Sequence, residues 1–377
     1  MIFYHAPLLI LFSHIYRIIW SIRKWLYDSG IFKTRRLPSP VICIGNITTG
    51  GTGKTPTVIA LARLLQGGKY NAAILSRGYK RRSQCPILEV SNGNNILSTP
   101  IESGDEPYLI ASTIKNIPVI VGADRIRSGR YAADHLGANL FILDDGYQHL
   151  KLHRDINILL IDAANPCGNG YLLPKGILRE PLSGISRADC IIVTRADEGD
   201  KRYVEEMVRL YNHNSPIFCA SYKPAGITDL KGNNLGHDYI SGKKVLLFAG
   251  IANPKSFKKS ILNLGGEISK ELLYPDHYWY NETDIGHILS EAHRLSIDAV
   301  VTTAKDAVRL LTTDDENPLP LRERDRACPD PESSSGVSGV RVGFSDEKIK
   351  IVVLHVEMEI DRQCYEWIEE QLAHKGG

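Results

Sequence analysis

The residues best suited to chemistry form a short run of small and hydroxyl side chains around a lysine. This run consists of Thr48, Thr49, Gly50, Gly51, Thr52, Gly53, Lys54 and Thr55. Glycines let backbone N–H groups surround a phosphate, a lysine there reaches the β- and γ-phosphate oxygens, and the next hydroxyl holds magnesium. The strict pattern has glycine where this chain has Thr48, but a strand-like run precedes the loop and a helical pattern follows it. The sequence therefore predicts a loop that binds the phosphates of ATP or GTP with Mg²⁺.

Two adjacent carboxylates supply a second nucleotide signal. Asp144 and Asp145 directly follow an apolar run at residues 140–143. P-loop proteins place an acid at a strand end beside the metal. Many exposed strand ends carry Asp, so the phosphate loop upstream is what favours the functional interpretation. Because successive side chains of a strand point to opposite sides, we expect only one of the two acids to meet the magnesium directly.

Phosphoryl transfer also needs a group that takes the proton of the acceptor hydroxyl. Asp105 and Glu106 lie in a Gly-Asp-Glu-Pro turn, and His277 follows an aspartate. Both sequences are also typical of an ordinary solvated turn, and spacing alone does not identify which residue is the base. Three basic residues are suited to neutralising phosphates: Arg125, Arg179 and Lys305.

The elements around these residues follow an α/β pattern. Short apolar, β-branched runs alternate with helical or loop stretches, which predicts parallel strands joined by right-handed crossovers. Such a sheet is covered by helices on both faces. We therefore predict a P-loop NTPase-type parallel sheet with helices on both faces. The strands of its first part are expected at residues 40–45, 72–76, 119–122, 140–143, 156–161 and 190–194.

The sequence also predicts a division of the chain into several parts. An extended run followed by the turn signal Lys231-Gly232-Asn233-Asn234 indicates linker strands, after which the α/β alternation resumes. Residues 313–347 are rich in Asp, Glu, Pro, Ser and Gly and are interpreted as a flexible insertion. We expect an N-terminal amphipathic helix in 1–37, a P-loop kinase domain in 38–216, linker strands in 217–244 and a smaller α/β domain in 245–377.

Composition sets broad limits on these predictions. The chain has 377 residues, enough for two domains, and its 43% hydrophobic and 23% charged residues are typical of a globular protein. A net charge of +2 argues against a broad nucleic-acid-binding surface. The seven cysteines are scattered and form no CxxC sequence, which favours reduced thiols in a cytosolic setting and argues against a zinc site.

The N-terminal segment has one apolar and one polar side. Six Lys or Arg residues against one Asp give residues 1–37 a net charge of +5. The uncharged stretch Met1–Tyr16 is shorter than the roughly 20 residues of a transmembrane helix, and its flanks do not fit a signal peptide. Helical spacing predicts one apolar face made of Leu8, Phe12, Ile15, Ile19, Ile22 and Leu26.

We interpret residues 1–26 as a helix that lies in an anionic membrane surface, with Trp20 and Trp25 at the boundary. A helix packed on the domain core would show the same pattern. A third possibility combines the two, with the helix packed along one edge and apolar side chains exposed elsewhere.

Eight short motifs occur in a characteristic order between the N-terminal helix and about residue 311. They are Gly45-Asn46, Gly50–Pro56, Ser76–Tyr79, Gly104–Pro107, Asp144–His149, Leu178–Pro181, Asp276-His277 and Lys305–Val308. As a set they closely resemble the tetraacyldisaccharide 4′-kinase family, the lipid A 4′-kinases of Gram-negative bacteria. That family also has threonine-type residues where the strict loop has glycine, so Thr48 is no departure, whereas the insertion at 313–347 is one.

The resemblance implies transfer of the ATP γ-phosphoryl group to the 4′-hydroxyl of a tetraacyl glucosamine disaccharide 1-phosphate. It implies two α/β/α domains joined by a two-stranded linker, with the site between them, on the cytoplasmic face of the bacterial inner membrane. A P-loop ATPase switch and a soluble small-molecule kinase are the alternatives.

The resemblance also implies roles for single residues. Asp105 would be the base, and His277 would orient or tune it. Since these two residues lie in different predicted domains, their pairing would require a closure that excludes water. Phosphate or substrate contacts would come from Glu106, Arg125, His149 and Arg179.

Overall fold

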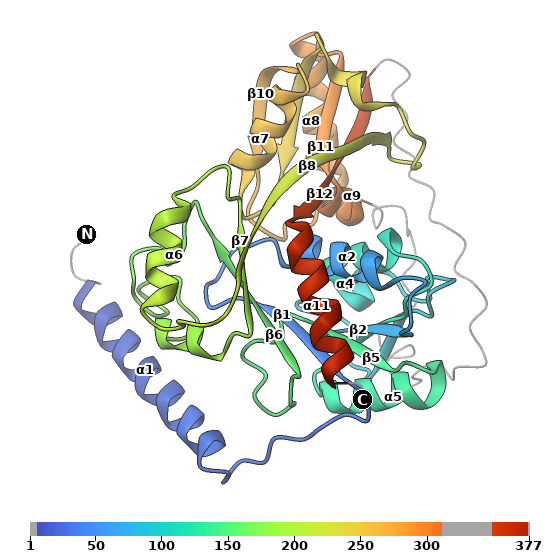
Figure 1. Cartoon of the computed structure of the whole chain (residues 1–377). Coiled ribbons are helices and arrows are strands. Elements are labelled where there is room, and N and C mark those ends of the chain that lie inside the picture. Colours follow the sequence, from blue (N-terminus) through green and yellow to red (C-terminus); the bar gives the residue numbers. More distant parts are fainter. Residues whose placement is uncertain (1–5, 311–348, 376–377) are drawn as a thin grey trace. The chain divides into compact units, whose positions relative to one another are not determined.

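The computed structural model describes residues 6–310 and 349–375 (Figure 1). The predicted insertion at 313–347 lies outside the described residues. The chain groups into two compact units, and neither is one continuous stretch. Unit 1 comprises Met1–Arg77, Gly122–Ser221 and Met358–Gly377, and unit 2 comprises Gly78–Val121 and Tyr222–Glu357. Residues 78–121, which the sequence analysis assigned to the P-loop domain, thus group with unit 2.

Unit 1 is built on a parallel sheet with the strand order β2-β5-β1-β6-β7-β8. The strands β1, β2, β5, β6 and β7 are buried over nearly their whole length because they consist mostly of apolar residues, whereas β8 is only partly buried. The register places Ile44 of β1 beside Asp144 of β5, so the ends of these two strands meet at one edge. The bounds are β1 Val41–Gly45, β2 Ala72–Ser76, β5 Leu140–Asp144, β6 Ile156–Asp162, β7 Cys190–Thr194 and β8 Ile217–Asp229.

The helices of unit 1 begin at residues that suit a helix start. α2 (Lys54–Leu65) follows Gly53 and packs against β1 and β5. α5 (Arg125–Leu136) begins after Asp124, whose carboxylate accepts two backbone N–H groups of the first turn. The remaining helices are α6 (Lys201–Arg209), the 3₁₀ helix η1 (Leu182–Arg187) and α11 (Arg362–Lys375).

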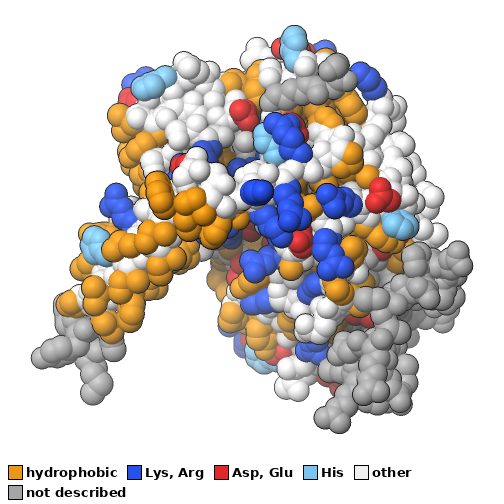
Figure 2. All heavy atoms as spheres, turned by 90° about the horizontal axis from the view of Figure 1, so that it is seen from below, with side chains coloured by type: hydrophobic (Ala, Val, Ile, Leu, Met, Phe, Trp, Pro, Cys, Tyr) orange, Lys and Arg blue, Asp and Glu red, His pale blue; other side chains and the backbone are white. Residues whose placement is uncertain are grey.

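α1 (Ala6–Asp28) packs along one edge and exposes apolar side chains elsewhere. Ser13 and Trp20 are buried, and the Tyr16 hydroxyl donates to the Arg179 carbonyl oxygen at 2.7 Å. The packing of the helix along one edge was one of the arrangements that the sequence left open, and its binding to a membrane stays a prediction. Large apolar side chains on the other sides are 38–60% exposed: Leu8, Leu9, Leu11, Phe12, Ile15, Ile18, Ile19, Ile22 and Trp25. Figure 2 shows hydrophobic side chains along this helix, and many Lys and Arg side chains are visible from the same side of the molecule.

Unit 2 contains a second parallel sheet with the order β10-β9-β11-β12. Alternate residues of β9 enter two separate cores, one completed by α7 and the other by α8, so the sheet is covered on both faces. The bounds are β9 Lys244–Ala249, α7 Pro254–Asn263, β10 Glu267–Leu273, α8 Glu282–Arg294, β11 Ala299–Thr303, α9 Ala304–Leu310 and β12 Lys350–Ile360, with the 3₁₀ helix η2 at His237–Ile240.

The stretch 78–121 adds four short elements to unit 2. β3 (Leu88–Ser91) pairs with β4 (Val119–Val121) in an antiparallel manner, and α3 (Pro100–Ser103) and α4 (Asp105–Thr113) lie between them in sequence. α4 packs against α9. The strands β8 and β12 both begin in one unit and end in the other.

The predicted α/β fold, with a large mostly parallel sheet and flanking helices, is confirmed. Among the described residues, no helix combines the length and the apolar character needed to cross a membrane.

Candidate active site

The phosphate loop joins β1 to α2 in unit 1, as the sequence predicts. Gly50 and Gly53 have φ values of 104° and 85°, the left-handed region that favours glycine. Asn46, directly after β1, makes two hydrogen bonds to the loop. Its side-chain amide donates to the Thr52 hydroxyl at 2.7 Å, and its Oδ1 accepts from Lys54 Nζ at 3.3 Å. The sequence analysis did not assign Asn46 to the site, although it lies in one of the quoted motifs.

The two acids after β5 have different partners. Asp144 is buried, and its Oδ2 accepts a hydrogen bond from the Ser76 hydroxyl at 2.9 Å. Asp145 has a left-handed φ of 51°, and its carboxylate lies 2.8 Å from Arg179 Nη1 and 3.8 Å from Lys54 Nζ. Burial alone would raise the pKa of Asp145, but Lys54 and Arg179 outweigh it and hold this pKa below its ordinary value.

The residues present fit a magnesium ion held with a nucleotide. Magnesium in kinases is bound by one or two carboxylates together with substrate phosphates and water. Thr55 follows the loop lysine, and Asp144 ends the neighbouring strand β5. Within the described ranges, no three His, Cys, Asp or Glu side chains come together as a metal site. Nucleotide phosphates and water would supply the other oxygen ligands of the ion, as in other kinases.

Arg125 and His149 lie near the same edge of unit 1. Arg125 begins α5 and is 5% exposed. Burial and the Arg77 charge lower its pKa below the ordinary value, although Asp144 and Asp145 act in the opposite direction. Burial and the Arg125 charge lower the pKa of His149 to about 4, so this imidazole is neutral at pH 7. Gln148 connects the segment to the loop, because its amide donates to the Asn46 carbonyl oxygen at 2.8 Å.

A second cluster of ionisable residues lies wholly in unit 2. His277 Nδ1 is 2.8 Å from Asp105 Oδ2. The Asp105 carboxylate is buried, which would raise its pKa, but the hydrogen bond from His277 and the charges of Lys305 and Arg309 hold it far below its ordinary value. Lys305 Nζ lies 3.0 Å from Glu106 Oε1. The sequence analysis expected Asp105 and His277 in different domains, whereas they belong to the same unit.

Local geometry fixes the position of each partner. Gly104 has a φ of 93°, and a Cβ there would approach the Tyr79 carbonyl oxygen to 2.9 Å, so the turn before α4 needs glycine. Asp105 then starts α4, where a negative charge is favoured. His277 has a left-handed φ of 63° in the turn after β10.

The ionised Asp105 carboxylate can only accept, so His277 Nδ1 carries the proton of the hydrogen bond between them. Lys305 Nζ lies 3.5 Å from the other ring nitrogen, Nε2, and Asp276 Oδ2 lies 3.8 Å from it. The pair thus consists of an ionised carboxylate and an imidazole that donates to it from Nδ1.

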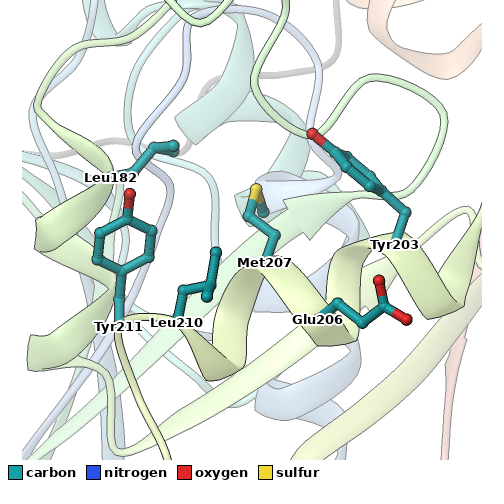
Figure 3. Close-up of a pocket in the computed structure, with 6 residues that line it drawn as sticks. All are labelled: Leu182, Tyr203, Glu206, Met207, Leu210 and Tyr211. Carbon is teal, nitrogen blue, oxygen red and sulfur yellow. The ribbon is translucent and has the colours of Figure 1, made fainter.

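The structure therefore collects the predicted residues in two groups. The loop Thr48–Thr55, Arg125, Asp144, Asp145, His149 and Arg179 belong to unit 1, and Asp105, Glu106, His277 and Lys305 belong to unit 2. Sequence reasoning missed Arg309, which contacts Asp105. A surface pocket on α6 and η1 contains none of these residues (Figure 3); it is lined by Leu182, Tyr203, Glu206, Met207, Leu210 and Tyr211.

Comparisons with known proteins agree on one family. A family model described as "Tetraacyldisaccharide-1-P 4'-kinase" matches residues 5–325. The tetraacyldisaccharide 4′-kinase of Syntrophus aciditrophicus is 43% identical over 315 residues, which are 81% of this chain and 84% of that protein. The one from Desulfatibacillum aliphaticivorans is 41% identical, covering 80% of this chain and 82% of the relative. The crystal structure of LpxK from Aquifex aeolicus in complex with ATP is similar with a TM-score of 0.70 at 30% identity, covering 96% of this chain and 97% of that one.

Proposed function

Because this chain belongs to the tetraacyldisaccharide-1-P 4′-kinase family, we propose that its phosphate loop presents ATP to a lipid acceptor activated by the Asp105–His277 pair. The protein is an ATP-dependent kinase of lipid A biosynthesis, acting on the 4′-hydroxyl of a tetraacyl glucosamine disaccharide 1-phosphate. ATP with Mg²⁺ supplies the γ-phosphoryl group. Family membership sets aside the ATPase switch and the soluble small-molecule kinase.

In unit 1, the proposed roles follow from the position of each side chain. The loop Thr48–Thr55 cradles the nucleotide phosphates, and Lys54 neutralises charge that develops during transfer. Thr55 and Asp144 hold the magnesium, while Asp145 orients Lys54 and Arg179. Phosphate or substrate contacts are assigned to Arg125, His149 and Arg179, together with Glu106 of unit 2.

In unit 2, the Asp105–His277 pair is proposed to take the proton of the acceptor hydroxyl. The pKa of Asp105 is held low by His277, Lys305 and Arg309 against the opposing effect of burial, which makes its carboxylate a weak base. Its Oδ2 already accepts from His277 Nδ1 and from Arg309 Nε. We therefore assign the proton to His277 Nε2, with Asp105 holding the imidazole and stabilising its protonated form. This exchanges the two roles that the family resemblance implied.

The contact between His277 Nδ1 and Asp105 Oδ2 is the observation that carries this proposal. The test is a kinase assay with Mg-ATP and a tetraacyl disaccharide 1-phosphate in mixed micelles. Asp105→Asn and His277→Gln are each expected to lower kcat by about 10²–10⁴-fold, the range of general-base catalysis. His287→Gln, an exposed position on α8, is the matched control.

Each arm of this assay has an outcome against the proposal. Undiminished turnover of either site variant would remove that residue from the pair. ATP hydrolysis by the wild type at the same rate without lipid would favour a switch. An acid limb of the pH–rate profile that is abolished by Asp105→Asn but unchanged by His277→Gln would return the proton to the carboxylate.

We also propose that α1 binds an anionic membrane surface, at the cytoplasmic face of the bacterial inner membrane. Its exposed apolar side chains are suited to acyl chains (Figure 2), and Arg17, Arg23 and Lys24 to anionic headgroups. An acceptor that carries four acyl chains stays in a bilayer, so its kinase is expected to work at that surface.

A further inference from the structure

Arg309, in the last turn of α9, is a fully buried cation between two carboxylates of unit 2. Its exposed fraction is 0%. Its Nε donates to Asp105 Oδ2 at 2.9 Å, and its Nη1 donates to Asp306 Oδ1 at 3.0 Å. A guanidinium without water is stable only where acceptors are placed around it, so its location must be fixed by these partners.

Asp306 is held in place by three other elements. Its Oδ1 accepts from the Gly250 N–H and from the Tyr280 hydroxyl, each at 2.9 Å. Its Oδ2 accepts from the hydroxyl of Thr303, the last residue of β11, at 2.6 Å. The carboxylate is fully buried. Asp306 is therefore a fixed anchor for the guanidinium of Arg309.

Arg309 and His277 share two acceptors. Asp105 Oδ2 accepts from His277 Nδ1 at 2.8 Å and from Arg309 Nε at 2.9 Å. The Gly250 carbonyl oxygen accepts from the His277 backbone N–H at 3.2 Å and from Arg309 Nη1 at 2.8 Å. One guanidinium thus holds both the carboxylate and the backbone turn that carries the histidine. That turn needs support, because His277 has a left-handed φ of 63°.

We propose that Arg309 is a positioning residue for phosphoryl transfer, which fixes the carboxylate of Asp105 against His277 while Asp306 orients Arg309. This inference rests on the function proposed above for the Asp105–His277 pair. Arg309 does not itself need to touch the acceptor. Its effect is geometric, through the two shared acceptors, and electrostatic, through a buried positive charge beside Asp105.

The charge of Arg309 gives a signature that a purely structural role lacks. The charged groups around the pair come from three places: Glu106 on α4, Asp276 in the turn after β10, and Lys305, Asp306 and Arg309 on α9. Removing one buried positive charge raises the proton affinity of both Asp105 and His277. The acid limb of the kcat/KM profile is therefore expected to move to higher pH.

The test uses Arg309→Met and Arg309→Lys in the full chain, with Arg294→Met as the matched control. Arg294 is an exposed arginine on α8 that forms an ion pair with Glu291. For Arg309→Met, kcat is expected to fall about 10–100-fold, with the KM for ATP within about two-fold and the acid limb raised by about half a pH unit or more. Arg309→Lys keeps the positive charge but cannot reach both acceptors. Its kcat is therefore expected to fall, while the acid limb of the kcat/KM profile stays at the wild-type pH.

Two combined variants keep the test decisive. Arg309→Met/Asp306→Asn removes a buried positive and a buried negative charge together and is used where the single variant does not fold. Its kcat is expected to fall as in the single variant, with a smaller shift of the acid limb. In a variant that already carries Asp105→Asn, adding Arg309→Met is expected to lower kcat by less than about three-fold, because Arg309 acts through Asp105. Full additivity, or a loss of kcat with no movement of the acid limb, would overturn the inference. A fully active Asp105→Asn variant would instead overturn the proposed function.

Discussion

Arg179 Nη1 contacts both carboxylate oxygens of Asp145, at 2.9 and 2.8 Å. Lys54 Nζ approaches the same carboxylate to 3.8 Å. Both oxygens of Asp145 are therefore already directed to cations, whereas Asp144 lies at the end of β5 with a neutral hydroxyl donor, Ser76. This difference favours Asp144 as the magnesium ligand, as proposed above, and the first prediction tests it.

The first prediction separates these two acids. Asp144→Asn is expected to raise the Mg²⁺ concentration for half-maximal activity by about ten-fold or more, because the metal loses a charged oxygen. Asp145→Asn is expected to lower kcat and to leave the Mg²⁺ requirement within about two-fold. Activity is measured across a magnesium titration at fixed ATP, with Asp134→Asn on the exposed side of α5 as control. The reverse pattern would assign the metal to Asp145.

The second prediction concerns the loop lysine. Lys54 Nζ is held by Asn46 Oδ1 at 3.3 Å, with a side chain only 11% exposed. Lys54→Met is expected to lower kcat by about 10²–10³-fold, because a fixed positive charge at the transferring phosphoryl group is lost. Lys69→Met, at an exposed position after α2, is expected to change kcat by less than about two-fold. Equal turnover by both variants would contradict the phosphate role.

The third prediction is a pH dependence of stability from His149. Its pKa in the folded protein is about 4, because of burial and Arg125, against an ordinary value of 6.5. The unfolded chain therefore binds a proton more readily, and stability is lost as pH falls below about 6.5. Between pH 7.5 and 5, wild type is expected to lose about 1–2 kcal/mol more than His149→Gln.

Urea unfolding at several pH values measures this difference. His135→Gln, an exposed histidine on α5, is the control and should follow the wild type. Parallel stability curves for the wild type and His149→Gln would show that the imidazole is not held neutral.

The fourth prediction tests the membrane surface of α1. Replacing Ile18, Ile19 and Ile22 with Ser removes side chains that are 53–60% exposed and leaves the packed residues of the helix in place. Affinity for anionic vesicles is expected to fall by about ten-fold or more, since each isoleucine contributes apolar area to the bilayer contact. Vesicle co-sedimentation measures it.

A matched triple variant controls for the loss of exposed apolar surface in general. Leu210, Leu262 and Leu273 are 51–74% exposed and lie outside α1, so their replacement with Ser should not change vesicle binding. Equal loss in both triple variants would mean that α1 is not the membrane surface.

Much of the fold could be predicted because the signals were local. The strands β1 and β2 are short apolar runs bounded by turns, and they were predicted to within a residue. The glycines and lysine of the loop have a spacing that one backbone conformation explains. The contact between Asp105 and His277 spans 172 residues and depends on where the chain leaves and re-enters the first sheet. Hydrophobic periodicity carries no information about that path.

Arg309 shows a second limit of sequence reasoning. In sequence it is one more basic residue near the end of a helix, a position typical of surface cations. Its complete burial follows from Asp306, three positions earlier, and from Asp105, which lies far away in the chain. Only the folded arrangement distinguishes such a residue from an exposed one.

The interleaved composition of the two units has a consequence for how the protein is made. Unit 1 includes residues from Met1–Arg77 and also from Met358–Gly377, where α11 lies. The Tyr70 hydroxyl after α2 donates to the Leu372 carbonyl oxygen in α11 at 3.3 Å. Because these two residues are 302 positions apart, unit 1 can form this contact only after residues 222–357 of unit 2 have been synthesised. The phosphate loop is therefore translated long before the helix that contacts the segment after α2.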